Sequence, residues 1–232
     1  MMQFRKMHGC GNDFVVVRAS SLSGIEDQSE VLVEFVRRIC DRHYGLGADG
    51  LLAWESRSAE SGLHIRMHYW NADGSRAEMC GNGARCVVRD AWEDAGQPAT
   101  AMQLQTDGGV RAVLVQGSGN DCVVSVDMGP PQWQPAQVPF LAVDATVDRA
   151  LDVPGLDVPG LQPGVSAVGM GNPHAIVFVE DHAALASIDL HELGARLSTH
   201  RRFPRGANVS FVLVDGDTLH LRVWERGVGP TV

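Results

Sequence analysis

The sequence predicts an α+β fold built from two similar halves, and three observations support this prediction. Short patterns of the first half return in the second half in the same order, at a nearly constant spacing of about 160 residues. Between its first two repeated patterns, each half contains a stretch in which apolar residues recur with the period of an amphipathic helix. Several other stretches alternate apolar and polar residues, which is typical of strands in antiparallel sheets.

The repeated patterns are glycine-rich turns and strand segments. The corresponding pairs are residues 9–12 and 169–172, 47–49 and 206–208, and 65–67 and 221–223. Because three matches in one order are difficult to explain by chance, we expect a duplication, with domains at 1–119 and 120–232. The boundary lies in the Gly-Ser-Gly-Asn segment 117–120, for which a hairpin turn within one sheet is the alternative interpretation.

Each predicted helix lies between the first two repeated patterns of its half. In the first half the apolar stripe runs from Leu32 to Cys40, and in the second half it comprises Leu190, Leu193 and Leu197 behind an Asp189 cap. Alternating strands are predicted at 63–70, 102–106, 110–116 and 122–128. Residues 129–164 are rich in proline and repeat Leu-Asp-Val-Pro-Gly, so we expect an irregular connection there.

The composition favours a cytoplasmic protein that acts on a small molecule. The 232 residues contain no apolar run long enough to span a membrane and no secretory leader. The formal net charge is -9 and there is no basic cluster, which argues against nucleic acid as a partner. The spacings of the five cysteines fit neither a disulfide framework nor a zinc site, so we expect reduced thiols and no metal.

No cofactor is expected. Lys6 is the only lysine of the chain, which leaves almost no candidate for a Schiff base with pyridoxal phosphate. There is neither a GxGxxG dinucleotide loop nor a phosphate-binding P-loop.

Cys80 is the strongest candidate for chemistry. It is followed by Gly-Asn-Gly and then by Ala84, Val87, Val88 and Ala91 on one helical face, which predicts a helix that starts directly after the thiol. Backbone N–H groups and the helix dipole stabilise a thiolate at that position, which makes the sulfur a usable base or nucleophile. The alternative is a buried cysteine that only packs, but the two glycines beside it allow a ligand to approach the backbone.

The chain resembles the diaminopimelate epimerase family over its whole length. The segments that carry this resemblance are residues 6–14, 42–50, 71–75, 80–86, 170–174, 202–204 with Asn208, and 225–227. The resemblance implies two pseudo-symmetric α+β domains, each a barrel-like, mostly antiparallel sheet around a central helix. It also implies a cytoplasmic, homodimeric enzyme of lysine and peptidoglycan precursor biosynthesis that interconverts LL- and meso-diaminopimelate without a cofactor.

The resemblance assigns roles to individual residues. Cys80 would remove the substrate's α-proton, and a second thiol would return a proton on the opposite face. Gly81, Asn82 and Glu225 would bind the reacting end of the substrate. The remaining implied substrate contacts are Asn71, Asn172, Asn208 and Arg226 at the distal end, and Asn12 at a further point.

The second thiol of the family would follow Glu225-Arg226-Gly227, and by the internal repeat it would lie beyond residue 232. The second domain is therefore expected to lack its central helix and last strands in this sequence. We expect either part of a longer, active enzyme or a truncated product with little activity.

Two other functions stay open. A different cofactor-independent isomerase of the same architecture would act on proline-like or phenazine-precursor substrates, and a cysteine-nucleophile hydrolase would need a Cys-His-Asn set that the sequence does not clearly offer. We expect His174 to have a structural or positioning role, and Cys10 and Cys86 to belong to the core. Asp13, Asp49 and Asp73 lie in glycine-rich turns and are expected to bond to nearby backbone.

Overall fold

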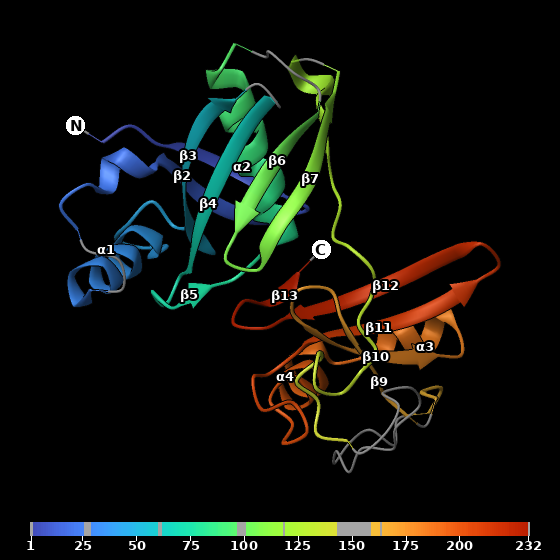
Figure 1. Cartoon of the computed structure of the whole chain (residues 1–232). Coiled ribbons are helices and arrows are strands. Elements are labelled where there is room, and N and C mark those ends of the chain that lie inside the picture. Colours follow the sequence, from blue (N-terminus) through green and yellow to red (C-terminus); the bar gives the residue numbers. More distant parts are fainter. Residues whose placement is uncertain are drawn as a thin grey trace. The chain divides into compact units, whose positions relative to one another are not determined.

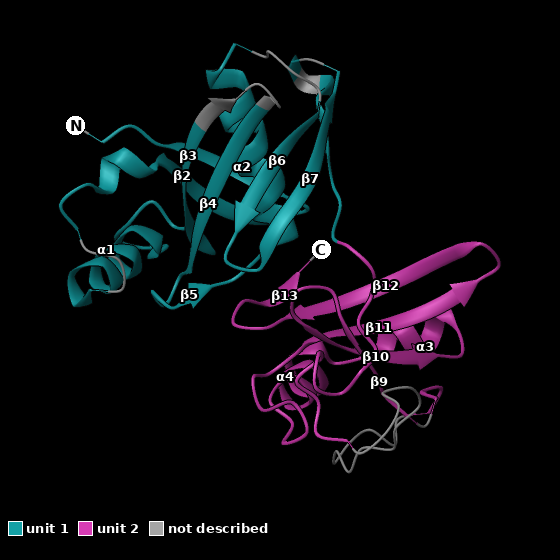
Figure 2. Cartoon of the chain, in the orientation of Figure 1, with its two compact units in different colours: residues 1–128 teal, residues 129–232 magenta. Residues whose placement is uncertain are grey.

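The computed structural model describes residues 2–25, 29–59, 62–96, 101–117, 119–142, 159–162 and 164–231. The chain forms two compact units, Met1–Met128 and Gly129–Val232 (Figure 2). This division falls after strand β8 (Val123–Val126), whereas the sequence prediction placed it at residue 119. Because β8 pairs with β7 (Gly109–Gln116), the segment between them belongs to the first sheet, as in the hairpin interpretation. Residues 143–158 and 163 of the predicted irregular connection, which include the first eight residues of the tandem repeat 151–160, lie outside the described residues.

Unit 1 contains one sheet in which the strands follow the order β1-β2-β3-β4-β6-β7-β8, with β5 added to β4. The strands not yet placed are β1 (Arg5–Gly9), β2 (Asn12–Arg18), β3 (Gly50–Ala59), β4 (Gly62–Asn71), β5 (Arg76–Ala77) and β6 (Ala101–Thr106). The sheet is mostly antiparallel, as predicted, and the pairs β2–β3 and β4–β6 are parallel. A short helix, η2 (Gly119–Asp121), lies between β7 and β8.

Helices cover both faces of this sheet. Helix α2 (Gly81–Asp94) packs against β1, β2, β3, β4 and β8 and is the central helix of the unit (Figure 1). Helices η1 (Ala19–Leu22) and α1 (Glu30–Cys40) lie on the other face, where α1 starts at the Ser29 cap. Along β2, Phe14 and Val16 belong to the core beneath α2, and Val15 and Val17 belong to the core beneath α1. The continuous apolar run of β2 follows from this double coverage.

Unit 2 contains a sheet of order β13-β12-β11-β10-β9. Its strands are β9 (Ser166–Gly169), β10 (Pro173–Val179), β11 (Asn208–Asp215), β12 (Thr218–Glu225) and β13 (Gly229–Thr231). Helices α3 (His182–Ser187), η3 (Leu190–Gly194) and α4 (Ala195–Ser198) connect β10 to β11. The predicted helical stripe is confirmed, since Leu190, Leu193 and Leu197 are buried in one core and the Asp189 carboxylate caps η3.

The duplication expected from the sequence is confirmed by the pairing of the strands. In unit 1, β1–β2 is antiparallel, β2–β3 is parallel with helices between them, and β3–β4 is antiparallel. In unit 2, β9–β10, β10–β11 and β11–β12 repeat this pattern. In the part of the chain that the structure describes, no helix combines the length and the apolar character needed to cross a membrane.

Candidate active site

Cys80 is the N-cap residue of α2, which confirms the predicted helix start. Its half-buried sulfur accepts a hydrogen bond from the Gly83 backbone N–H, with 3.4 Å between nitrogen and sulfur. A donor at this distance, at the positive end of the helix dipole, stabilises the thiolate. The geometry agrees with a proton-transfer role for Cys80, and that role itself stays a prediction.

Asn12 lies directly beside this thiol. The Cys80 sulfur lies 3.6 Å from the Asn12 Oδ1, and the Asn12 side chain is buried, with 1% of the residue exposed. The turn before Asn12 comes very close to the start of α2, since a Cβ atom added to Gly9 would lie 2.9 Å from the Asn82 carbonyl oxygen. Only glycine allows this approach, which brings Asn12 and Cys80 together.

Gly81 and Asn82 are the first two residues of α2. The first N–H groups of an α-helix have no partner within the helix, and together with the dipole they favour a bound anion such as a carboxylate. The Asn82 Oδ1 accepts a hydrogen bond from the Arg85 guanidinium, which also contacts the Cys10 sulfur at 3.4 Å. The N-terminus of α2 thus combines a thiol, backbone donors and one cation.

Asn71 lies at the same edge of the sheet as Asn12. It is the last residue of β4 and pairs with Gly50, which pairs in turn with Phe14, two positions beyond Asn12. Paired residues point to the same face of a sheet, so Asn71 shares the α2 face with Phe14. Its side-chain nitrogen donates to Ser75 Oγ at 2.9 Å.

In unit 2 the predicted substrate contacts also meet at one sheet edge. Asn172 directly precedes β10, Asn208 begins β11, Glu225 ends β12 and Arg226 follows it. The Asn208 Oδ1 accepts a hydrogen bond from the Arg226 backbone N–H at 2.8 Å, and the Arg226 guanidinium donates to the Arg205 carbonyl at 2.8 Å. The Glu225 carboxylate accepts from the Thr231 hydroxyl at 3.3 Å.

His174 lies in this second group, and its expected structural or positioning role stays a prediction. Its Nε2 lies 2.8 Å from the Asn172 Oδ1, and its register partner is Asn208. Burial lowers the pKa of His174, and the positive charge of Arg226 lowers it further. The imidazole is therefore neutral at pH 7, and its Nε2–H donates to the amide oxygen of Asn172.

A network of charges behind Asn12 was not predicted. Asp49 Oδ2 accepts from the Asn12 side-chain nitrogen at 2.8 Å and from the Asp13 backbone N–H at 3.0 Å, and Arg42 bridges the carboxylates of Asp13 and Asp49. Burial would raise the pKa of Asp13, but hydrogen bonds from Arg42 and Lys6 outweigh it and hold this pKa below its ordinary value. The expected bonding to nearby backbone is thus wrong for Asp13 and Asp49.

For Asp73 the same expectation is confirmed, because its Oδ1 accepts from the Ser75 backbone N–H at 2.8 Å.

Of the two cysteines predicted to belong to the core, the structure buries one. Cys86 is buried as expected, and burial raises the pKa of its thiol to about 11. Cys10, expected in the core, is exposed at the tip of the β1–β2 turn with a φ of 53°. The tight turn that carries Asn12 towards Cys80 places Cys10 outside.

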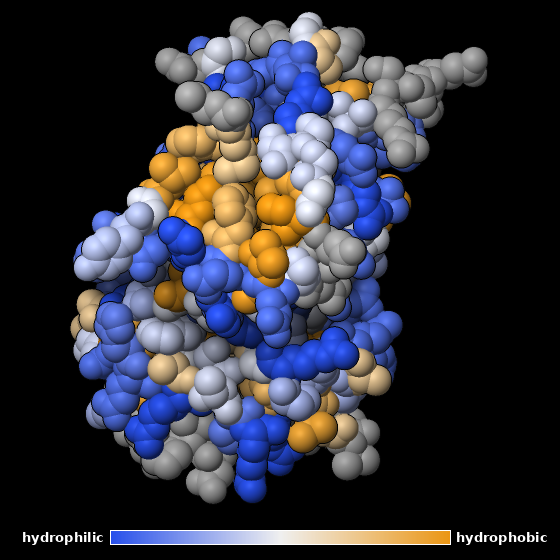
Figure 3. All heavy atoms as spheres, turned by 90° about the vertical axis from the view of Figure 1, so that its left-hand side faces the viewer, coloured by the Kyte–Doolittle hydropathy of each residue, from blue (hydrophilic) through white to orange (hydrophobic). Residues whose placement is uncertain are grey.

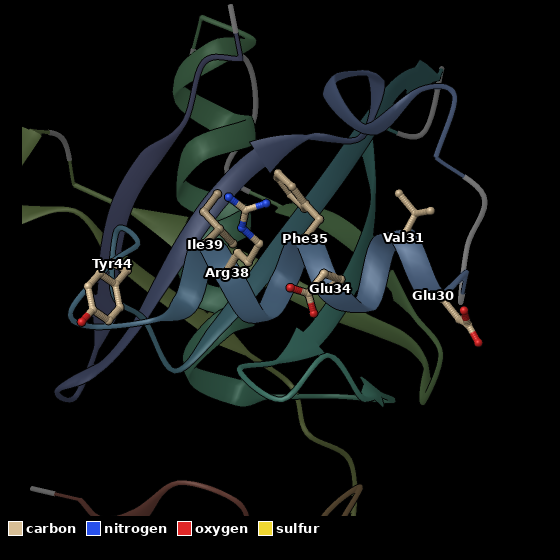
Figure 4. Close-up of a pocket in the computed structure, with 7 residues that line it drawn as sticks. All are labelled: Glu30, Val31, Glu34, Phe35, Arg38, Ile39 and Tyr44. Atoms are coloured by element: carbon tan, nitrogen blue, oxygen red, sulfur yellow. The ribbon is translucent and has the colours of Figure 1, made fainter.

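Two further features lie outside these groups. A groove of about 750 Å³ runs along α1, on the face shown in Figure 3, and its lining residues are labelled in Figure 4. Val31 and Tyr44 in this groove are 66% and 95% exposed, and none of the predicted site residues lines it.

In unit 2, His182, Asp215 and His220 bring their ligand atoms within 4.8 Å of one another, which is the only such group among the described residues.

Comparison with known proteins gives one consistent result. The sequence model of the family described as diaminopimelate epimerase matches residues 4–134 and 166–232. The diaminopimelate epimerase of Azotobacter vinelandii is 38% identical over 232 residues, which cover all of this chain and 78% of that protein. The diaminopimelate epimerase of Aromatoleum aromaticum is 39% identical with the same coverage.

Solved structures show the same fold at low sequence identity. A probable proline racemase from Agrobacterium radiobacter superposes with a TM-score of 0.64 at 16% identity, covering 100% of this chain and 72% of that chain. A phenazine biosynthesis protein of the PhzF family from Bacillus anthracis gives 0.59 at 16% identity, covering 99% and 74%.

Proposed function

Because the chain belongs to the diaminopimelate epimerase family, we propose that its site interconverts LL- and meso-diaminopimelate by proton transfer at one α-carbon, without a cofactor. The observation that carries this proposal is the Cys80 sulfur at the N-terminus of α2, 3.4 Å from a backbone N–H and 3.6 Å from the Asn12 amide oxygen. A thiolate held there is a base, and the thiol formed after proton removal is an acid.

An α-carbon bound to hydrogen is a very weak acid, so the site has to stabilise the negative charge that develops on the substrate. The N–H groups at the start of α2, at Gly81 and Asn82, supply fixed donors for the α-carboxylate, which carries part of that charge. Stabilisation by fixed dipoles costs no reorganisation during the reaction. Glu225 would bind the ammonium group at the reacting carbon.

The distal end of diaminopimelate is a second amino acid, with a carboxylate and an ammonium group. Amides offer both donors and acceptors, and an arginine can bind a carboxylate with two parallel hydrogen bonds. By the family resemblance, Asn71, Asn172, Asn208 and Arg226 would bind this end of the substrate, and neutral His174 would hold the Asn172 amide. We further propose that the protein is cytoplasmic and forms a homodimer. Cell fractionation would test the location, and sedimentation of the purified protein would test the dimer.

The test measures the removal of the α-proton and the formation of the meso product separately, because the two proton transfers take place on opposite faces of the α-carbon. Purified protein is incubated with LL-diaminopimelate in D₂O without pyridoxal phosphate. Deuterium at the α-carbon is measured by mass spectrometry, and the meso form is measured by chiral chromatography. We expect deuterium incorporation that disappears in Cys80→Ala. The meso form should appear only if a second acid delivers a proton on the face of the α-carbon opposite to Cys80. Deuterium incorporation that survives in Cys80→Ala would refute the proposed role.

A further inference from the structure

The first unit holds one amide between a carboxylate and the candidate catalytic thiol. The Asn12 side-chain nitrogen donates to Asp49 Oδ2 at 2.8 Å, and the Asn12 Oδ1 lies 3.6 Å from the Cys80 sulfur. Asn12 is 1% exposed, so water does not compete effectively for either contact.

This arrangement fixes which end of the amide faces the sulfur. A carboxylate can only accept hydrogen bonds, and of the two polar atoms of an Asn side chain only the nitrogen donates. The nitrogen of Asn12 must therefore face Asp49, and the oxygen must face Cys80. An amide oxygen accepts a hydrogen bond from a protonated thiol and offers none to a thiolate.

Asp49 is held in place by its other contacts. Its Oδ1 accepts from Arg42 at 2.7 Å, its Oδ2 also accepts from the Asp13 backbone N–H, and its own backbone N–H donates to the Asp13 carbonyl at 2.8 Å. The parallel pairing of Phe14 with Gly50 places Asp49 beside the start of β2. The carboxylate is thus built into the sheet edge and paired with a cation.

We propose that Asp49 is a positioning residue that holds the Asn12 amide oxygen toward Cys80, where it accepts the hydrogen bond of the protonated thiol. The Gly83 N–H on the same sulfur favours the thiolate, so the two contacts serve the two protonation states between which the proposed reaction moves Cys80. This inference rests on the proposed function for its purpose, although the amide orientation can be tested without turnover.

The test measures alkylation of Cys80 by iodoacetamide as a function of pH, with modified peptides identified by mass spectrometry. In Asp49→Asn the residue at 49 can also donate, so Asn12 can turn its nitrogen toward the sulfur and stabilise the thiolate. We expect the midpoint of the alkylation profile to move down by about half a unit to one unit, which is a roughly threefold to tenfold faster reaction below the midpoint. Exchange of the substrate α-proton should slow while KM changes less.

The matched control is Asp94→Asn, which removes another arginine-paired carboxylate of the same unit, at the opposite end of α2. Its profile should equal that of the unchanged protein. Cys86 interacts electrostatically with the Cys80 thiol, Arg85 contacts Cys10 at the start of α2, and Asp13 pairs with Arg42 and Lys6 beside Asp49; both variants keep all of these side chains.

A merely structural role of Asp49 would speed the alkylation of several thiols at every pH and leave the Cys80 midpoint unchanged, and this result would overturn the proposal. Asn12→Ala is the second test, for the case in which Asp49→Asn does not fold. It keeps Asp49 and removes the amide oxygen, so the midpoint of the Cys80 alkylation profile should also move down. An unchanged midpoint in Asn12→Ala would overturn the proposal as well. Deuterium incorporation that survives in Cys80→Ala would refute the proposed function and leave this alkylation measurement valid.

A second, independent inference concerns His182, Asp215 and His220. They come from the start of α3, the end of β11 and the first half of β12. His220 pairs with Leu213, two residues before Asp215, so His220 and Asp215 point to the same face of the sheet. The His182 Nε2 lies 3.5 Å from the Asp215 carboxylate, and the centroids of the two imidazole rings are 4.6 Å apart. Two imidazoles and a carboxylate are a common zinc ligand set, and tetrahedral coordination needs ligand atoms roughly 3.3 Å apart.

We infer that this group binds one divalent transition-metal ion such as Zn²⁺, because exposed side chains can close the remaining distance at low cost. Titration calorimetry with Zn²⁺ uses protein whose accessible thiols have been blocked with iodoacetamide. One ion should bind, at least tenfold more weakly in His182→Gln and in His220→Gln, and unchanged in the control His43→Gln. Absence of binding to the unchanged protein, or equal binding to all variants, would overturn the inference.

Discussion

Gly9→Ala is the sharpest test of how the fold places Asn12 beside Cys80. The added Cβ would lie 2.9 Å from the Asn82 carbonyl oxygen, 3.1 Å from its Cα and 3.2 Å from its Cβ. These atoms belong to the first turn of α2, so no side-chain rotation relieves the collision. An ordinary contact requires the turn and the helix to separate by about 0.5 Å.

This separation acts directly on the candidate site. The Cys80–Asn12 distance of 3.6 Å would grow to about 4.1 Å, beyond the range of a hydrogen bond to sulfur. A misplacement of 1 Å costs about a hundredfold in rate, so half of it should cost about tenfold. Overpacking should also lower the free energy of unfolding by about 1–3 kcal/mol.

The assay combines urea unfolding, deuterium exchange at the substrate α-carbon and alkylation of Cys80. Gly194→Ala is the matched control, because its Cβ would lie 2.8 Å from Trp224 in unit 2 and would overpack that core without touching the Asn12 turn. The control should lose stability and keep the Cys80 alkylation profile. A Gly9→Ala protein with unchanged stability and an unchanged exchange rate would refute the reasoning.

Three further predictions concern titratable groups. Cys80→Ser should retain the fold and lower the α-proton exchange rate by about a hundredfold to ten-thousandfold, because an alcohol is a far weaker acid than a thiol; circular dichroism and the deuterium assay check this. The pKa of His174 is lower in the folded than in the unfolded chain, so His174 is protonated at a higher pH in the unfolded chain, and stability should fall as the pH drops below about 6.5. The urea midpoints at pH 7.5 and pH 5.5 should therefore differ less in His174→Gln than in the unchanged protein. Cys40 and Cys86 should stay unmodified by iodoacetamide at pH 8 while Cys10 reacts, because burial raises the pKa of both thiols to about 11; peptide mass spectrometry reads this directly.

The sequence predicted those features of the site that depend on neighbouring residues. The glycines after Cys80 and the helical stripe behind them were sufficient to place the thiol at a helix start. The contact between Cys80 and Asn12 joins residues 68 positions apart, and the bond between Asn12 and Asp49 joins residues 37 positions apart. Both depend on strand register, which a single sequence specifies only through its hydrophobic pattern. For this reason Asp49 was interpreted as a local turn residue.

The repeated sequence pattern and the strand register differ by one residue at the position of Asn208. The sequence pattern aligns Asp49 with Asn208, whereas the register pairs Phe14 with Gly50 and His174 with Asn208, so Gly50 is the structural counterpart of Asn208. A shift of one residue along a strand moves a side chain to the opposite face. The amide of Asn208 therefore shares the face of His174, where unit 1 carries a glycine.

Unit 1 cannot carry an amide at this position. A Cβ atom on Gly50 would lie 2.5 Å from the Trp70 carbonyl oxygen and 2.7 Å from the Tyr69 ring. The two halves thus share a backbone arrangement and differ in the side chains at equivalent positions. The edge of unit 1 packs tightly around Cys80 and Asn12, and the edge of unit 2 carries the hydrogen-bonded side chains of Asn172 and Asn208. Duplication gave the two units equivalent sheet edges. At the equivalent position, unit 2 carries the amide side chain of Asn208, whereas unit 1 has room only for Gly50.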